Sequence, residues 1–352
     1  MKMKIDGRPL RVLHILKSSI YSGAESVVIT MIKRMSDEYD MMYVATDGEI
    51  KTTLQQEKIP HFLLKEFSRK SISDVIKTFR PDIVHAHDFT ASVLCASILG
   101  RFRLISHLHH NPCWAREWNL KSMVYMISIY RFSNILTVSK NAYDDIVFTK
   151  LGRKKMEVMG NPIDVNRICT LGNCSDIIEL YDVLFVGRFV NEKNPKAFIE
   201  IINKLHKSNH KVRSAMLGTG ELWEECRQMI DRYGLQEYIK LLGFQKNPYK
   251  YMKASRMICI TSEREGYGLV AAESNILGVP VISTRNGGVA EIFGLNALEL
   301  CDNLAEFPTK IWNVLTDKEE YQKWRRRALE RQNSFVSVDD YVSRMKIIYK
   351  GN

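Results

Sequence analysis

The sequence has few of the features that mark small secreted, fibrous or membrane-spanning proteins. Its seven cysteines are scattered without a Cys-x-x-Cys pair, which argues against a disulfide framework or a structural zinc site. No apolar run approaches the roughly 18 residues that span a bilayer, and residues 1–11 lack a signal-peptide core. The 19 glycines and 9 prolines among 352 residues are too few for a collagen-like or low-complexity chain. We therefore expect a cytoplasmic, globular protein.

Two signatures of cofactor and metal binding are also missing. The loop at residues 18–25 lacks the full Gly-x-Gly-x-x-Gly fingerprint and the acidic residue that follows it in dinucleotide-binding proteins, so an NAD site is poorly supported. No Asp-x-Asp motif occurs, so the sequence gives no sign of a magnesium ion that bridges to phosphates. We expect neither a metal nor a resident cofactor, and positive side chains and helix ends would have to stabilise a bound phosphate.

Positive charge is distributed unevenly along the chain. The 51 Lys and Arg against 40 Asp and Glu give a net charge of +11. Residues 1–160 carry 24 basic and 16 acidic side chains, a net +8, and residues 161–352 carry 27 and 24, a net +3. This asymmetry favours an anionic surface facing one domain, such as a phospholipid bilayer, over uniform binding to nucleic acid. A solvated basic face is the alternative.

Short β-rich runs alternate with amphipathic helical segments, which predicts parallel sheets with helices on both faces. About two domains are expected at this length. Turn chemistry at 159–164, followed by weak periodicity, predicts a boundary there. The sequence thus predicts two Rossmann-like α/β domains, 1–164 and 165–337, separated by a cleft, and a final helix at about 338–352 that can pack back onto the first domain. Predicted strands include 10–16, 82–87, 103–108, 183–186 and 257–261, and predicted helices include 24–35, 121–131, 195–207 and 269–277.

The most informative window is residues 261–273, which follows a predicted strand. Glu265 lies in the loop, Gly266 and Gly268 flank Tyr267 at the mouth of a helix, and Glu273 lies inside that helix. The glycines allow a close approach of the backbone, and the helix start offers unpaired N–H groups to an anion. Two carboxylates beside an anion site fit a ligand that also has sugar hydroxyls. Acidic residues that merely favour a helix N-terminus are the alternative.

A second window, residues 186–195, follows the first strand of the second domain. Arg188 and Lys193 lie five residues apart in a loop that leads into a helix. Both cationic groups can converge on one diphosphate, where they would stabilise a leaving group. Taken alone, such a pair is also common as solvated surface.

The first domain offers a small-residue loop and two histidine groups. Ser22 and Gly23 precede the first helix and would let a phosphate or sugar approach. His85 and His87 end one predicted strand, and His107 and His109 end the next. Paired histidines on one strand face could bind zinc, but a catalytic zinc site needs a defined third ligand. We instead expect one imidazole to donate a hydrogen bond to a substrate hydroxyl.

Residues 114–131 combine aromatic side chains, methionines, arginine and lysine after the histidine loop. Such a segment can rest on a membrane interface or contact a lipid-linked acceptor. It can equally be a buried helix whose aromatic residues belong to the core, and the sequence slightly favours that reading.

Together these windows resemble the retaining glycosyltransferases of family 4, whose fold is the two-domain GT-B type. The resemblance covers essentially the whole chain, and the stretch 106–111 is similar in style to capsule and exopolysaccharide transferases of bacteria. This chain has Ser22-Gly23 where many members have Gly-Gly, which leaves the conformation of that loop open. The residues that carry the resemblance are Ser22 to Glu25, the linker 160–164, Gly187, Arg188, Lys193, Glu265, Glu273 and 286–291.

The resemblance implies a role for each residue of the site. Arg188 and Lys193 would neutralise the nucleotide diphosphate, and Glu273 would bind the ribose hydroxyls. Glu265 would approach the donor sugar, helped by backbone amides from Gly266 through Tyr267 and Gly268 to Leu269. Gly23 would lie close to the donor phosphates. His109 would be the histidine near the sugar, with His107 as the competing assignment.

The resemblance further implies a sugar transfer with retained anomeric configuration from a nucleotide-diphosphate sugar to a glycan or lipid-linked acceptor, in the synthesis of cell-surface polysaccharide. The enzyme would be cytoplasmic or peripheral at the inner face of the plasma membrane, without nucleic acid as a partner. Two alternatives remain at this point, a nucleotide-sugar epimerase of the same architecture and a non-catalytic basic module that binds membrane or polyanion. The sequence leaves the nucleotide base, sugar, acceptor, linkage and oligomeric state open.

Overall fold

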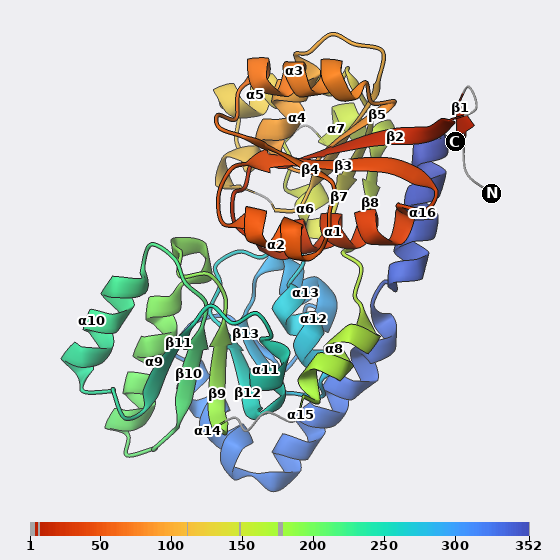
Figure 1. Cartoon of the computed structure of the whole chain (residues 1–352). Coiled ribbons are helices and arrows are strands. Elements are labelled where there is room, and N and C mark those ends of the chain that lie inside the picture. Colours follow the sequence, from red (N-terminus) through yellow and green to blue (C-terminus); the bar gives the residue numbers. More distant parts are fainter. Residues whose placement is uncertain (1–3, 6–7, 111, 148, 175–178, 352) are drawn as a thin grey trace. The chain divides into compact units, whose positions relative to one another are not determined.

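The protein is described here from a computed structural model, which covers residues 4–5, 8–110, 112–147, 149–174 and 179–351. The chain divides into two compact units (Figure 1). Unit 1 comprises residues 1–162 and 338–352, and unit 2 comprises residues 163–337. Within the described ranges, no helix is both long and apolar enough to cross a membrane.

Unit 1 is built on a sheet whose strands run in the order β4-β3-β2-β5-β6-β7-β8. These strands are parallel, and β1 pairs with β2 in the antiparallel direction. The strands are β1 (Lys4–Ile5), β2 (Arg8–Ile15), β3 (Tyr39–Thr46), β4 (His61–Leu64), β5 (Ile83–Ala86), β6 (Arg103–Leu108), β7 (Phe132–Thr137) and β8 (Met156–Val158). The helices are α1 (Gly23–Met35), α2 (Ile50–Gln56), α3 (Arg69–Phe79), α4 (Phe89–Ala96), α5 (Leu120–Ser128), α6 (Lys140–Asp144), α7 (Thr149–Gly152) and α16 (Val338–Lys350), with short 3-10 turns η1 (Cys113–Arg116) and η2 (Arg153–Lys155).

The two faces of this sheet differ in chemistry because side chains alternate along each strand. One face carries Leu13 and Ile15 of β2 and Val84 of β5, which pack into an apolar core with α3, α4 and α5. The opposite face carries His14 and His85, both fully buried. In Figure 1, α1 and α16 lie on this second side of the sheet.

The last helix of the chain, α16, packs onto unit 1. Tyr349 pairs through its hydroxyl with Nδ1 of His85 at 2.8 Å, and Arg103 of β6 donates to the Tyr349 carbonyl at 2.9 Å. Arg344 forms a bidentate ion pair with Glu157 of β8. Residues far apart in sequence therefore complete a single unit.

Unit 2 repeats this architecture with a parallel sheet ordered β11-β10-β9-β12-β13-β14. Its strands are β9 (Tyr181–Val186), β10 (Ser214–Leu217), β11 (Ile239–Gly243), β12 (Ser255–Ile260), β13 (Val281–Thr284) and β14 (Leu300–Cys301). Its helices are α8 (Val165–Gly172), α9 (Pro195–Lys207), α10 (Trp223–Tyr233), α11 (Tyr249–Lys253), α12 (Leu269–Ile276), α13 (Gly287–Phe293), α14 (Phe307–Thr316) and α15 (Lys318–Glu330), with turns η3 (Asn191–Lys193) and η4 (Arg331–Ser334).

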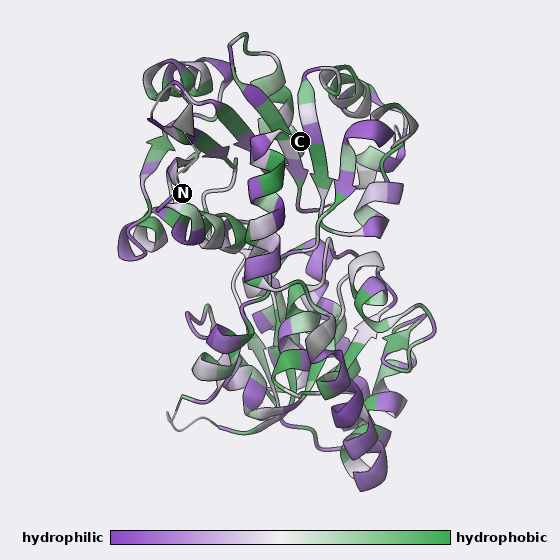
Figure 2. Ribbon diagram, turned by 90° about the vertical axis from the view of Figure 1, so that its right-hand side faces the viewer, coloured by the Kyte–Doolittle hydropathy of each residue, from purple (hydrophilic) through white to green (hydrophobic). Residues whose placement is uncertain are grey.

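Two apolar clusters sandwich the sheet of unit 2. Phe185 and Met257 pack with α9, α10 and α14 on one face, and Leu184 and Ile258 pack with α8, α11 and α12 on the other. Hydrophobic residues gather on the strands and hydrophilic residues on the outer helices (Figure 2). The predicted α/β class with two parallel sheets is confirmed.

Candidate functional site

The strand order of unit 2 reverses between β9 and β12, and the helices that follow these strands, α9 and α12, pack on opposite faces of the sheet. A reversal of this kind leaves a crevice at the carboxyl ends of the strands, where ligands bind in open α/β sheets. The loop after β9 contains Arg188 and Lys193, and the loop after β12 contains Glu265. Three residues predicted for one site therefore lie in the two loops that flank the switch point.

Local backbone chemistry fixes the loop after β9. Asn194 adopts a left-handed conformation with φ of 48°, and its side chain accepts a hydrogen bond from the amide of Ala197, which caps α9. Thr261 donates to the Asn194 carbonyl at 2.8 Å and to the Lys193 carbonyl at 3.1 Å. The Thr261 hydroxyl thus joins the two loops. Arg188 is exposed.

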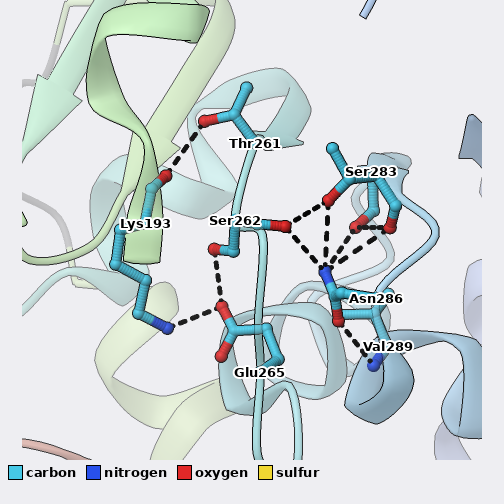
Figure 3. A network of polar contacts seen from close by, with 8 residues as sticks. Lys193, Thr261, Ser262, Glu265, Ser283, Asn286 and Val289 are labelled. Atoms are coloured by element: carbon cyan, nitrogen blue, oxygen red, sulfur yellow. Dashed lines mark hydrogen bonds and ion pairs between the residues drawn. The ribbon is translucent and has the colours of Figure 1, made fainter. Parts of the chain in front are cut away.

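Lys193 and Glu265 meet across the switch point (Figure 3). Lys193 Nζ donates to Glu265 Oε1 at 2.6 Å, and Ser262 Oγ donates to the same oxygen at 2.8 Å. The two charged side chains are only 22% and 11% exposed. This contact differs from the sequence expectation, which assigned Lys193 to the diphosphate and Glu265 to the sugar without joining them. A ligand bound here would contact a preformed pair of opposite charges.

Asn286, for which the sequence predicted no role of its own, holds the β12 loop in place (Figure 3). Its amide donates to the Ser262 carbonyl and to Thr284 Oγ1, each at 3.3 Å. Its Oδ1 accepts a hydrogen bond of 3.1 Å from the amide of Val289, so that the same side chain caps α13. Ser262 and Asn286 are uncharged, so the charge pattern that singled out Lys193 and Glu265 gave no signal for them.

Glycines bring backbone close to the site. Gly268 precedes α12 in a left-handed conformation with φ of 87°, which glycine adopts without strain. A Cβ added to Gly288 would lie 2.8 Å from the Glu265 carbonyl oxygen and 2.9 Å from the Tyr267 carbonyl carbon. The start of α13 therefore packs directly on the loop of the predicted donor residues. The first turn of α12, from Leu269, presents backbone N–H groups without intrahelical acceptors.

Glu273 lies within α12 and outside the Lys193–Glu265 network. Tyr249 Oη donates to Glu273 Oε1 at 3.0 Å. Burial of the carboxyl raises the pKa of Glu273 to about 7, against the opposing effects of the Tyr249 hydrogen bond and the positive charge of Arg167. The sequence predicted Glu273 for the site but missed Tyr249 and Arg167, which tune its charge.

Unit 1 has its own switch point between β2 and β5. The loop after β2 leads to Ser22, whose hydroxyl donates to the buried Glu25, and to Gly23, the first residue of α1. Asp88 follows β5, accepts a hydrogen bond of 2.9 Å from the amide of Lys17 and caps α4. These contacts fix the loop that contains Gly23.

The candidate histidines of unit 1 are buried. His107 is fully buried, whereas His109 is 8% exposed and pairs through Nε2 with His87 Nδ1 at 3.0 Å. Burial lowers the pKa of His109 to about 3, against an opposing effect of Asn161, so that the ring is neutral at neutral pH. The greater exposure favours His109 over His107 as the residue that reaches a substrate. Asn111, at the end of the stretch 106–111, lies outside the described residues.

The outer side of α5 is apolar and exposed. Its inner residues Ser122 and Tyr125 are buried. The exposed side chains of α5 and its flanks are Trp118 (67%), Leu120 (77%), Met123 (45%), Val124 (39%), Ile127 (65%) and Tyr130 (85%). The core reading that the sequence slightly favoured holds for Tyr125 and for Trp114, which packs against the core, and it is wrong for Trp118 and Tyr130.

Comparisons with known proteins agree with this architecture. The family described as "Glycosyltransferase Family 4" matches residues 21–167, and the family described as "Glycosyl transferases group 1" matches residues 179–331. An N-acetylgalactosamine-N,N'-diacetylbacillosaminyl-diphospho-undecaprenol 4-alpha-N-acetylgalactosaminyltransferase of Campylobacter jejuni is 27% identical over 347 residues, covering 90% of this chain and 93% of the relative. The capsular polysaccharide biosynthesis glycosyltransferase CapH of Staphylococcus aureus is 26% identical over 318 residues, covering 83% and 86%.

Solved structures share the fold. Anabaena Alr3699/HepE in complex with UDP and glucose superposes with a TM-score of 0.81 at 22% identity, covering 97% of this chain and 99% of that chain. One family description matches mainly the first unit and the other matches within the second, and on these grounds the chain belongs to the family 4 glycosyltransferases and is a glycosyltransferase with the GT-B fold.

Proposed function

We propose that this enzyme transfers a sugar, with retention of anomeric configuration, from a nucleotide-diphosphate sugar to a glycan or lipid-linked acceptor in the synthesis of cell-surface polysaccharide. The observation that carries the proposal is the contact between Lys193 and Glu265 at the switch point of unit 2. An anion-binding surface alone has no use for a carboxylate there. A sugar diphosphate does, because its phosphates need cations and its hydroxyls need acceptors.

The donor diphosphate would lie between the cationic side chains and the helix end. Arg188 is exposed and can reach a ligand in solution, and Lys193 is held in place by Glu265. The N-terminus of α12 adds N–H groups and a partial positive charge. Departure of the nucleoside diphosphate builds negative charge on its bridging oxygen, and groups aimed at that oxygen stabilise the transition state more than the ground state. We expect these positive groups to stabilise that charge without a metal ion.

The two glutamates would bind the hydroxyl groups of the donor. Glu265, fixed by Lys193 and Ser262, accepts hydrogen bonds from hydroxyls of the transferred sugar, and the amides from Gly266 to Leu269 support the sugar and phosphates. Glu273 accepts from the ribose. In unit 1, Gly23 would allow the phosphates to approach, and His109 would donate to a sugar hydroxyl. The family resemblance implies each of these roles, and the contacts described above support those of the residues in unit 2.

The test compares Arg188→Ala and Lys193→Ala with Lys196→Ala. Lys196 lies three residues after Lys193 and pairs with the exposed Glu225, so it is a matched lysine outside the site. We expect each site variant to lose about 10²–10³ in turnover with the true donor, as is typical when one electrostatic donor is removed. Turnover close to wild type in both site variants would rule out the diphosphate contact.

Product mass separates transfer from epimerisation. A panel of nucleoside-diphosphate sugars, including the UDP-sugars, would first be screened by thermal shift, since a bound ligand raises apparent stability. A transferase adds the mass of the sugar to an acceptor and releases the nucleoside diphosphate. An epimerase consumes one substrate and needs no acceptor, and a non-catalytic basic module produces neither change.

We further propose that unit 1 rests on an anionic bilayer through the exposed face of α5. Leu120 and Ile127 supply apolar area, and Lys121 is exposed on the same helix. Arg131 follows α5 and donates to the Gly100 carbonyl, which brings the exposed Arg101 to the end of the helix. Apolar side chains ringed by basic ones are the pattern of helices that bind the interface of anionic membranes.

The bilayer proposal is tested by sedimentation with vesicles. We expect binding to vesicles that contain phosphatidylglycerol, weaker binding to purely zwitterionic vesicles, and loss of binding in the double variant Leu120→Glu/Ile127→Glu. Leu180→Glu is the control, because Leu180 is 69% exposed but lies in unit 2. Equal binding by the double variant and this control would contradict the assignment of α5.

A further inference from the structure

Five histidines gather on one face of the sheet of unit 1. Their rings come from β2, from β5 and the residue after it, and from β6 and the residue after it. The side chains at positions two residues apart fall on the same face of a strand. Those of His14, His85, His87 and His107 are no more than 1% exposed. So much imidazole in a closed interior is unusual, because buried polar atoms nearly always have hydrogen-bond partners.

Three of these rings converge. His14 Nδ1 and His87 Nε2 are 2.9 Å apart, and one ring nitrogen each of His14, His85 and His87 lie within 4.8 Å of one another. Two nitrogen ligands of a tetrahedral zinc ion lie roughly 3.3 Å apart, given Zn–N bonds of about 2.0–2.1 Å. Small movements of the three rings would therefore bring them to the spacing of metal ligands.

The second nitrogens of two of the three rings support the same reading. Nε2 of His85 is buried without a hydrogen-bond partner among the described residues and is thus available to an ion, and the second nitrogen of His14, Nε2, also lacks a partner there. The other nitrogen of His85 faces the Tyr349 hydroxyl at 2.8 Å. His87 Nδ1 faces His109 Nε2 at 3.0 Å. A metal-bound histidine usually donates its second N–H to such a partner, which fixes the ring.

We propose that His14, His85 and His87 bind one divalent transition-metal ion, for which imidazole nitrogens make Zn²⁺ the natural candidate. The ion would lie inside unit 1 and would hold together β2, β5 and, through Tyr349, α16.

One consequence rests on the proposed function. A metal ion on His87 Nε2 leaves the ring proton on Nδ1, which donates to His109 Nε2. His109 must then hold its own proton on Nδ1, which is the nitrogen left without a hydrogen bond of ordinary geometry within the described part of the chain. The ion would thereby fix the tautomer of His109, the residue proposed to lie near the sugar, without itself contacting the substrate.

A second set competes for the same ion. One nitrogen each of His87, His107 and His109 also lie within 4.8 Å of one another. His107, however, has no hydrogen-bond partner on either ring nitrogen within the described residues, whereas His85 is oriented by Tyr349. The first set therefore has the better supported ligands, and variants of His14 and His107 distinguish the two.

The experiment uses the full chain without a histidine tag, expressed in zinc-supplemented medium and freed of loose metal by gel filtration. Elemental mass spectrometry should find about one Zn²⁺ per chain. Cobalt-substituted protein should show visible absorption from the histidine-bound ion. We expect His14→Asn and His85→Gln to retain less than a tenth of the zinc, and Tyr349→Phe to bind zinc about 10–100-fold more weakly.

Two variants serve as controls. His107→Gln stays within the cluster, and His61→Gln lies at β4 outside it, and both should keep the wild-type zinc content. The proposal is overturned if wild-type protein holds no stoichiometric zinc even after refolding with Zn²⁺, or if His107→Gln loses zinc while His14→Asn keeps it. Should the ligand variants not fold, the wild-type zinc content and cobalt spectrum still decide. Because no donor is present, the result is independent of the proposed transfer reaction.

Discussion

Tyr249 donates a hydrogen bond of 3.0 Å to Glu273, a carboxyl group whose pKa burial raises to about 7. The hydrogen bond favours the ionised form, but desolvation outweighs it. Glu273 is therefore held near its midpoint at physiological pH, where a bound ribose that donates two hydroxyls would draw it to the ionised state.

The raised pKa makes the stability of the ligand-free enzyme depend on pH. Because the folded state holds this proton more tightly than the unfolded state, the contribution of Glu273 to stability is full below pH 4.5 and is lost as pH rises toward about 7. We expect Glu273→Gln to gain up to about 3 kcal/mol relative to wild type over this range. Urea unfolding between pH 4.5 and 8 measures the difference, with the exposed Glu237→Gln as control. A constant difference across pH would contradict the prediction.

The same group predicts the pH dependence of donor binding. A ribose hydroxyl donates a stronger hydrogen bond to the ionised carboxylate than to the protonated carboxyl group. The affinity for the nucleotide should therefore rise with pH through about 7 and then level off. In Glu273→Gln the affinity should be lower and this rise absent. Calorimetric titration with the nucleoside diphosphate at several pH values provides the measurement.

Asn286→Ala should weaken donor binding as well as stability. The variant loses the cap of α13 and the hydrogen bond to the Ser262 carbonyl, so we expect a loss of about 1–2 kcal/mol in the free energy of unfolding. Asp317→Ala is the matched control, since it removes the cap of α15 in the same unit. Both should lose stability, but only Asn286→Ala should lose donor affinity. Equal donor affinity in the two variants would show that Asn286 only caps its helix.

Gly288→Ala should move the loop that contains Glu265. The added methyl group would meet two backbone atoms of that loop at less than 3.0 Å, and backbone cannot move aside as a side chain does. Overpacking of this kind costs about 1–3 kcal/mol. The donor KM should rise together with the loss of stability, and Gly288→Val should be worse on both measures. A stable Gly288→Ala variant with unchanged kinetics would contradict the prediction, because the loop would then accommodate the methyl group without loss of stability or function.

Tyr341→Ala should destabilise unit 1 although it lies near the end of the chain. Tyr341 is 1% exposed and contacts Met31 of α1. Removing a large buried aromatic group costs about 3–5 kcal/mol. Hydrogen exchange should accelerate in peptides of residues 8–147 more than in those of unit 2. Ile347→Ala, at a position 42% exposed on the same helix, is the control.

The fold was predictable wherever local signals were strong. The helix predicted at 195–207 has the bounds of α9, because Pro195 fixes its start and an apolar stripe marks its length. The elements α2, β4 and β8 were not predicted. Helix α2 buries only Ile50 and Leu54, and β8 has three residues, so neither has the length over which a periodic pattern becomes visible.

The charged residues of the candidate site could be predicted from the sequence, but the contacts between them could not. Loops after parallel strands drew attention to Lys193 and Glu265, but their hydrogen bond joins residues 72 positions apart, which only the folded chain defines. Tyr249 has no charge and lies in a short helix, so the sequence around it gave no sign of a contact with Glu273. The amphipathic pattern of α5 fits a buried and a surface helix equally, and exposure alone decides between them.

The return of α16 to the first unit has a consequence for synthesis on the ribosome. Domains generally fold as they emerge, with the N-terminal part first. Here the sheet of unit 1 is translated early but waits for residues 338–351 to cover its histidine face, while unit 2 is translated in full between the two parts. Unit 1 therefore begins to emerge from the ribosome first but completes its fold last.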